Sequence, residues 1–292
     1  MTAIFKVILA MIFFITIPAA AQASPAEYQI YTAGGQKIIS EDLGRIIDKY
    51  DVIVFGEYHD HALLHRLEAG LLHSAYARQN KLAVSLEMFE RDVQSQLNSY
   101  LAGELTETEF LDRSRPWKNY RDAYRPLVEF AKAHVLPVLA ANIPRTMAAH
   151  YARTGSLKGI GPEMAVYLPQ LHSAPEGEYR RNFMAYMSSG QMPVTKDKLE
   201  DYYKAQCLKD DTMAESIAGF IRQNPGYKVI HYQGDFHSRQ RLGVVEKLQL
   251  LQPELKVAVI TPVYAGELSN LPDLLRQHRQ AGDVIIFLKQ AV

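Results

Sequence analysis

The sequence predicts an α/β protein with a mostly parallel central sheet flanked by helices, and two observations carry the prediction. Short apolar runs rich in β-branched residues, such as 51–55, 82–86 and 228–232, are typical of strands covered on both faces. Longer segments with helical periodicity separate these runs, and strands that alternate with helices favour parallel pairing. We therefore expect helices on both faces of the sheet.

The elements are expected in a regular order along the chain. A helix over 38–50, with Ser40 as its N-cap and two acidic residues in its first turn, leads into the first strand. Polar residues follow several of the strands directly. The expected strands are 51–55, 82–86, 135–140, 228–232, 256–261 and 283–289, and the other expected helices are 61–79, 92–101, 107–112, 120–133, 179–187 and 196–223.

The segment 161–224, in the C-terminal half, has a different character. It is rich in Tyr and Met and contains no convincing strand pattern, and the stretch 190–193 interrupts its helical periodicity. We interpret it as a helical insertion that lies over the sheet, either as a lid or as a wall. Residues 24–292 are then expected to form a single domain.

The N-terminus has the pattern of a secretory signal peptide. Lys6 precedes a short apolar run at 7–17, and Ala21-Gln22-Ala23 matches a small-residue cleavage site. An uncleaved membrane anchor is the alternative, but the run is shorter than the ~18 to 20 apolar residues that span a bilayer. We predict a signal peptide over 1–23, cleaved near Ala23, and an exported, periplasmic mature chain without a membrane anchor.

Charge and cysteine content exclude some ligands and some covalent features. The chain has 32 basic and 32 acidic residues, so it lacks the positive surplus typical of proteins that bind nucleic acid. Its one cysteine, Cys207, is far from the leader and excludes a lipoprotein anchor and an intramolecular disulfide. Cys207 lies in a helical pattern with no nearby histidine, which favours a buried, inert thiol.

Polar side chains follow three of the predicted strands. Glu57 and His59 follow the first strand, Glu87 the second, and Asp235 and His237 the fourth. The tetrads at 56–59 and 234–237 share the form Gly-x-x-His, in which glycine permits a tight turn at the strand end. Because ligands gather beyond the carboxyl ends of parallel strands, we expect these side chains at one rim.

This set of side chains is suited to two kinds of chemistry. Two histidines and two carboxylates are donors that a divalent ion accepts, and the same groups can act as general acid and base. The alternative is structural: Glu57 caps a helix or pairs with an arginine, and each histidine satisfies a backbone carbonyl. The case for a site is stronger for His59, Glu87 and His237 than for Glu57 and Asp235.

Further candidates lie close to this rim in the sequence. His61, His65 and Glu68 share one helical face, apart from the leucine stripe, and a solvated face is the expected environment of His65. Asn142 and Arg145 follow the third strand. Arg145 at a helix N-terminus suits a carboxylate or phosphate, and a surface salt bridge is the equal alternative.

The tyrosines of the insertion form the last group of candidates. An aromatic and methionine lining suits a flat apolar ligand, and tyrosine can ligate haem iron. The same composition is also common in an ordinary core. The tyrosines concerned are Tyr167, Tyr179, Tyr186, Tyr202 and Tyr203.

Several short motifs can be compared with known families. They are FGEYHD at 55–60, SLEMFER at 85–91, the stretch 117–131 with YRPL at 124–127, ANIPR at 141–145, the stretch 205–215, and GDFH at 234–237. In this order they resemble the ChaN-like haem-binding family, of a superfamily with the Tiki and TraB metalloproteases and the erythromycin esterases. The resemblance implies an exported protein of bacterial haem or iron acquisition that binds haem in an apolar pocket. It also implies that two copies of the chain can share such a pocket in a homodimer.

The enzymatic relatives imply a second hypothesis, a metal-dependent hydrolase. By position, metal binding or water activation would fall on His59, Glu87 and His237, with Glu57 beside them. For haem, the resemblance leaves the iron ligand open, and the chain lacks the anchor cysteine of lipidated members. The candidates for haem binding are Tyr202, Tyr203, Tyr179, Tyr186 and Arg145.

Overall fold

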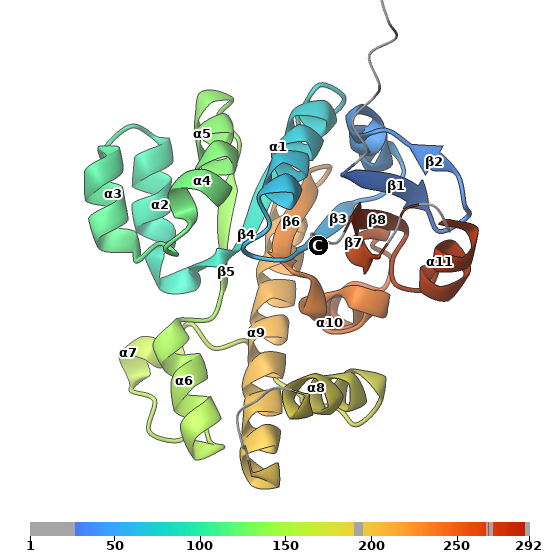
Figure 1. Ribbon diagram of the computed structural model, residues 1–292. Coiled ribbons are helices and arrows are strands. Elements are labelled where there is room, and N and C mark those ends of the chain that lie inside the picture. The colour runs from blue at the N-terminus through green and yellow to red at the C-terminus, as the bar shows by residue number, and fades with distance from the viewer. Residues whose placement is uncertain (1–26, 190–194, 267, 269–270, 290–292) are drawn as a thin grey trace, which may run out of the picture.

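The computed structural model describes residues 27–189, 195–266, 268 and 271–289 (Figure 1). The predicted signal peptide, 1–23, and the predicted interruption at 190–193 lie outside these residues. No helix among the described residues combines the length and apolar character needed to cross a bilayer.

One eight-stranded sheet runs through the molecule in the order β2-β1-β8-β7-β3-β6-β4-β5. The six strands from β8 to β5 pair in parallel, which confirms the predicted mostly parallel sheet. An antiparallel edge of β1 and β2, which the sequence analysis did not predict, completes it. The strands are β1 (Tyr28–Thr32), β2 (Lys37–Ile38), β3 (Val52–Glu57), β4 (Leu82–Glu90), β5 (Val138–Asn142), β6 (Lys228–Gly234), β7 (Val257–Ala265) and β8 (Val284–Lys289).

Helices cover both faces of this sheet (Figure 1). In one core, α1, η1 and the α2–α5 group pack on the sheet, and in the other α9 and α10 do so. The helices are η1 (Ser40–Asp48), α1 (Ala62–Tyr76), η2 (Arg91–Val93), α2 (Gln94–Leu101), α3 (Glu107–Ser114), α4 (Tyr120–Ala123), α5 (Arg125–Ala133), α6 (Arg145–Thr154), α7 (Pro162–Ala165), α8 (Glu178–Ser188), α9 (Lys196–Gln223), η3 (Asp235–His237), η4 (Arg239–Arg241), α10 (Val244–Leu251) and α11 (Leu271–His278).

The continuous apolar runs of the strands supply both cores. In β3, Ile53 and Phe55 belong to the core under α1, whereas Val52 and Val54 belong to the core under α9. Alternate side chains of a strand point to opposite faces, so a strand buried on both sides needs apolar residues at every position. This is why the runs identified the strands in the sequence.

Several predicted element bounds differ from the structure, and two of these differences have a clear local cause. The helix expected over 38–50 is the 3-10 helix η1, and Ser40 is its first residue rather than its cap: the Ser40 hydroxyl donates to Glu41. A Cβ on Gly44 would lie 2.4 Å from the backbone of Ser74, so η1 packs directly against α1. The strand expected over 135–140 begins only at Val138, because Val135 has a φ of 55° and Leu136 still bonds back to Ala131.

The predicted helical insertion is confirmed and has two parts. The C-terminal half of α9 lies on the sheet, where Met213, Ala214 and Ile217 enter the core. Its N-terminal half runs beyond the sheet, and α6 and α8 flank it there (Figure 1). The rim of the sheet and the α6–α8–α9 layer are therefore neighbours.

Candidate functional site

The polar rim lies at the carboxyl ends of β3, β6 and β4. β6 pairs in parallel with β3 on one side and β4 on the other, and Glu57 is in register with Gly234. Glu87 lies within the end of β4, where the register with β5 shifts between Leu86 and Glu90. Strand pairing thus brings residues that are far apart in sequence to one edge.

A histidine–carboxylate pair stands at the end of β3. His59 Nδ1 lies 2.6 Å from Glu57 Oε1, and the Tyr124 hydroxyl donates to the same oxygen at 2.6 Å. The Trp117 ring packs edge-on against the His59 imidazole, with 4.8 Å between centroids. Because Nδ1 is held by Glu57, the Nε2 atom of His59 is the one left to face the rim.

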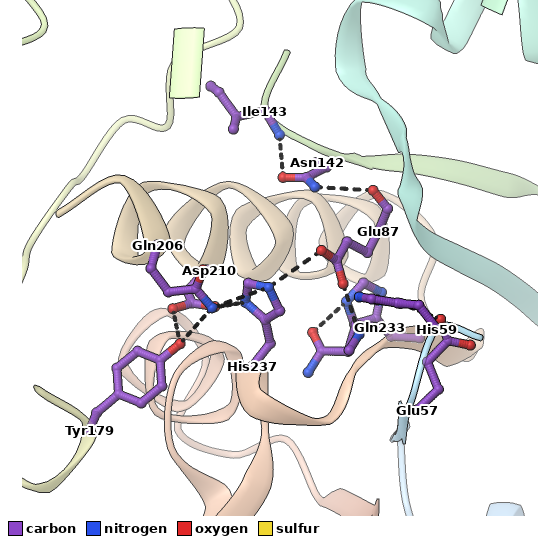
Figure 2. A network of polar contacts seen from close by, with 12 residues as sticks. Glu57, His59, Glu87, Asn142, Ile143, Tyr179, Gln206, Asp210, Gln233 and His237 are labelled. Atoms are coloured by element: carbon purple, nitrogen blue, oxygen red, sulfur yellow. Dashed lines mark hydrogen bonds and ion pairs between the residues drawn. The ribbon is translucent and has the colours of Figure 1, made fainter. Parts of the chain in front are cut away.

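A second pair stands after β6, where His237 Nδ1 lies 2.5 Å from Asp210 Oδ1 of α9 (Figure 2). The Tyr179 hydroxyl donates to the other oxygen of Asp210 at 2.7 Å. The side-chain amide of Gln206, one turn earlier on α9, lies 3.2 Å from His237 Nδ1. The insertion therefore fixes the orientation of His237 through three side chains.

Glu87 lies between the two pairs. Its Oε1 is 3.3 Å from His237 Nε2, and its Oε2 accepts a hydrogen bond of 2.8 Å from the N–H of Gly234. A Cβ on Gly234 would lie 2.8 Å from His59 Nε2 and 3.7 Å from Glu87 Oε2. His237 Nε2 thus faces the Glu87 carboxylate, and the missing side chain of Gly234 leaves room for His59 Nε2 on the same side.

The charges at the rim reinforce one another. Burial disfavours the charged form of His237, but Glu87 and Asp210 outweigh it and raise the His237 pKa to about 9. Burial also opposes ionisation of Glu87, yet His237, Lys209 and His59 lower its pKa. The pKa of His59 is raised against burial, chiefly by the hydrogen bond with Glu57. The carboxylate and the two imidazoles thus stabilise one another's charged forms.

Asp235 faces away from this centre. It accepts hydrogen bonds from Thr261 and from Arg239, and burial raises its pKa. Gly56 leaves space for it, since a Cβ there would lie 2.6 Å from Asp235 Oδ1. Asp235 thus joins η3 to β7 and packs against β3.

The solvated environment expected for His65 is wrong. His65 is 8% exposed and Glu68 is completely buried. His65 Nδ1 lies 3.0 Å from Glu68 Oε2, its Nε2 donates to the backbone oxygen of His59, and its ring packs edge-on against Tyr124. The helices α4 and α5 pack beside α1 and cover this face, a tertiary contact that helical periodicity does not reveal.

The predicted metal ligands His59, Glu87 and His237 stay a prediction. Among the described residues, the group whose donor atoms all lie within 4.8 Å of one another is a different one, Glu57, His65 and Glu68.

A cleft opens beside the rim, between α6, α8 and α9. It has a volume of about 390 Å³, and Gln206, which contacts His237, lies in its wall. Most of the wall is apolar, and two cationic side chains and one tyrosine complete it. The lining residues are Arg145, Ala148, Ala149, Ala152, Phe183, Met187, Tyr202, Ala205, Gln206 and Lys209.

The four candidate tyrosines fall into different environments. Tyr179 and Tyr203 are buried, and their hydroxyls donate to Asp210 and to the backbone oxygen of Pro175. Burial raises the pKa of both phenols. Tyr186 is 67% exposed on α8, beside Phe236. Tyr202 lines the cleft, and its hydroxyl makes no hydrogen bond to any described residue.

Arg145 makes a salt bridge and is also accessible to an anionic ligand, the two roles that its position in the sequence suggested. It begins α6, pairs with Glu90 and donates to the backbone oxygen of Arg115 at 2.8 Å. Half of its side chain is still exposed, and it contributes to the wall of the cleft. The salt bridge therefore orients a guanidinium that remains accessible to a ligand.

Comparison with known proteins places this geometry in a family. The model of a family described as "Haem-binding uptake, Tiki superfamily, ChaN" matches residues 45–248. The chain belongs to the ChaN family. This confirms the resemblance seen in the motifs.

Solved structures share the fold of this ChaN-family protein. A structure of ChaN from Campylobacter jejuni, described as showing cofacial haem binding, matches with a TM-score of 0.65 at 18% identity, over 90% of this chain and 97% of that one. A mutant of the erythromycin esterase EreC in its open conformation matches with a TM-score of 0.47 at 14% identity, over 77% of this chain and 72% of that one. No curated protein matches the chain in sequence.

Sequence reasoning missed Asp210 and the part that Tyr179 and Gln206 play beside it. All three lie in the insertion, on α8 and α9. Gln206 and Asp210 contact His237 only in the folded chain, and Tyr179 bonds to Asp210. The one available signal was the i, i+4 spacing of Gln206 and Asp210, which places them on one face of a helix. That spacing alone is common on solvated helices.

Replacing Asp210 tests the electrostatic account of this ChaN-family rim. Asp210→Asn removes a negative charge at hydrogen-bond distance from His237, so the His237 pKa should fall from about 9 by roughly one unit or more. NMR titration of the imidazole resonances measures it. Asp211→Asn is the matched control, because Asp211 is also buried but pairs with Lys247 and His172. An unchanged His237 pKa in Asp210→Asn would contradict the assignment.

Proposed function

We propose that this protein binds haem in the cleft between α6, α8 and α9, and that it serves bacterial haem or iron acquisition as an exported, periplasmic protein. The observation that carries the proposal is the lining of the cleft, which combines an apolar wall, a tyrosine and two cationic side chains. The family description, haem-binding uptake, supports the same ligand. The signal-peptide pattern of 1–23 supports export.

The wall of the cleft suits the porphyrin ring. Ala148, Ala149 and Ala152 present small side chains along α6, and Phe183 and Met187 face them from α8. Small residues on one side let a flat ring approach the helix, and Phe and Met offer polarisable contacts on the other. A flat apolar ligand therefore buries most of one face there.

Tyr202 is the tyrosine best placed to bind the iron. A tyrosine ligand must give up its phenolic proton, and Tyr179 and Tyr203 hold theirs in buried hydrogen bonds. Tyr202 lies in the wall of the cleft without such a bond. Tyr186 is exposed on α8 and is not among the lining residues.

Arg145 and Lys209 suit the two propionates. Both line the cleft, from α6 and from α9, and guanidinium and ammonium groups bind carboxylates through charge-assisted hydrogen bonds. Arg145 is already oriented by Glu90. The open side of the cleft leaves the second face of the ring free for a second copy of the chain, so a homodimer belongs to the proposal.

Haemin titration of the purified protein tests this function. The wild-type protein should give a saturable Soret band with high-spin charge-transfer bands typical of tyrosinate ligation. Tyr202→Phe should lose those bands and bind haemin at least about tenfold more weakly, since it loses the iron ligand. Tyr203→Phe, a change of the neighbouring residue outside the cleft, is the control and should retain both. An unaltered spectrum in Tyr202→Phe would refute the ligand assignment.

A second candidate function, hydrolysis at the rim, is favoured by the pairing of His237 Nε2 with Glu87 and by the position of His59 Nε2 beside Gly234. Glu87, a weak base because neighbouring cations lower its pKa, would accept a proton from a water molecule as the resulting hydroxide attacks an ester carbonyl, and His59 would donate a proton to the leaving oxygen. His59 suits the second role because its side chain is 39% exposed, and Glu57 and Asp210 would position the two imidazoles.

Ester hydrolysis by the metal-free protein tests this second function. Glu87→Gln removes the proton acceptor with almost no change in volume, so turnover of any ester the wild type hydrolyses should fall about 10²- to 10⁴-fold. The far-UV circular dichroism spectrum of the same variant should match that of the wild type and serves as the folding control. Wild-type protein that is inactive on a broad ester panel, or a variant as active as the wild type, would exclude hydrolysis at the rim.

A further inference from the structure

A buried triad of Glu57, His65 and Glu68 lies behind the rim, on the side of α1. We propose that this triad is a site for a divalent metal ion of the zinc class, separate from the haem cleft. One donor atom from each residue lies within 4.8 Å of the others. The proposal goes beyond haem binding and does not depend on it.

The two carboxylate oxygen atoms of Glu57 have different surroundings. Oε1 is committed to the rim, because His59 and the Tyr124 hydroxyl both bond to it. Oε2 is buried, lies 3.3 Å from His65 Nδ1 and has no N–H or hydroxyl donor. Burial and the Glu57 carboxylate raise the pKa of Glu68, so without an ion the two carboxyl groups share a proton. A divalent cation would take the place of that proton.

Glu68 offers a similar vacant oxygen. Its side chain is completely buried, its Oε2 lies 3.0 Å from His65 Nδ1, and its Oε1 has no hydrogen-bond partner. His65 has one Nδ1 position to share between two carboxylates. A divalent ion bound at that point would displace the proton of Glu68 and neutralise both carboxylates at once.

The second nitrogen of His65 is arranged as in a metal-binding histidine. Its Nε2 donates to the backbone oxygen of His59 at 2.9 Å, and that oxygen also accepts from Asn119 at 2.7 Å. Histidine ligands usually donate their other N–H to a carbonyl or carboxylate, which fixes the ring and its tautomer. Here the bond leaves Nδ1 as the donor atom for an ion.

A cavity beside α1 reaches one member of the triad, His65. It has a volume of about 460 Å³, and Asp60, Asp122 and Arg66 are its charged lining residues. Two carboxylates against one guanidinium give this wall a negative surplus, which favours the approach of a cation. One imidazole with two carboxylates and no thiolate is a donor set that zinc accepts.

Calorimetric titration of the full chain with Zn²⁺, after treatment with a chelator and without haem, tests the site. Wild-type protein should bind one Zn²⁺, and Glu68→Gln should weaken binding about 100-fold or more, since it removes a charged ligand. Glu87→Gln is the control, because it alters the rim and leaves the triad intact. The proposal would be overturned if the wild type bound no Zn²⁺. It would also be overturned if Glu87→Gln lost Zn²⁺ binding while Glu68→Gln retained it.

X-ray absorption spectroscopy of the zinc-loaded wild type shows which side chains bind the ion, even if Glu68→Gln does not fold. The triad predicts one imidazole among oxygen ligands. Two imidazoles would place the ion between His59 and His237 at the rim and would refute the triad. Haemin titration of the same sample separates the two proposals, because zinc in the triad should leave the Soret band of added haemin unchanged.

Discussion

The parallel pairing of β6 with both β3 and β4 is the constraint on which the candidate site depends. It sets Gly234 beside Glu57 and lets its N–H reach the carboxylate of Glu87. Three strand ends from distant parts of the sequence thereby form one rim, as the ends of neighbouring parallel strands do in open sheets. The apolar runs that bury the strands on both faces therefore also determine where the polar chemistry lies.

The rim joins two other parts of the molecule through single side chains. Glu57 holds His59 with one oxygen and offers the other to the triad with His65 and Glu68. On the far side, Gln206 contacts His237 and also lines the α6–α8–α9 cleft, and the charge of Lys209 in that cleft lowers the pKa of Glu87. A ligand in the cleft would therefore alter the electrostatics of the rim, and an ion in the triad would alter the basicity of Glu57.

The fold and half of the site could be predicted from the sequence. The strands were visible because apolar residues occupy every position, and the two Gly-x-x-His tetrads were visible because each follows such a strand directly. The role of Asp210 could not be predicted, because it depends on the packing of α9 across the end of β6. The burial of His65 and Glu68 was hidden for a related reason: helical periodicity describes one helix, and α4 and α5 cover a second face of α1. Local patterns predict elements and strand ends, whereas contacts between distant helices need the packed chain.

A crystal structure of the protein with bound haemin tests the central claim most directly. The account predicts the ring between α6 and α8 along α9, with the Tyr202 oxygen on the iron and the propionates next to Arg145 and Lys209. A ring bound elsewhere on the molecule, or one in the cleft with its iron held by another residue while Tyr202 points away, would contradict it.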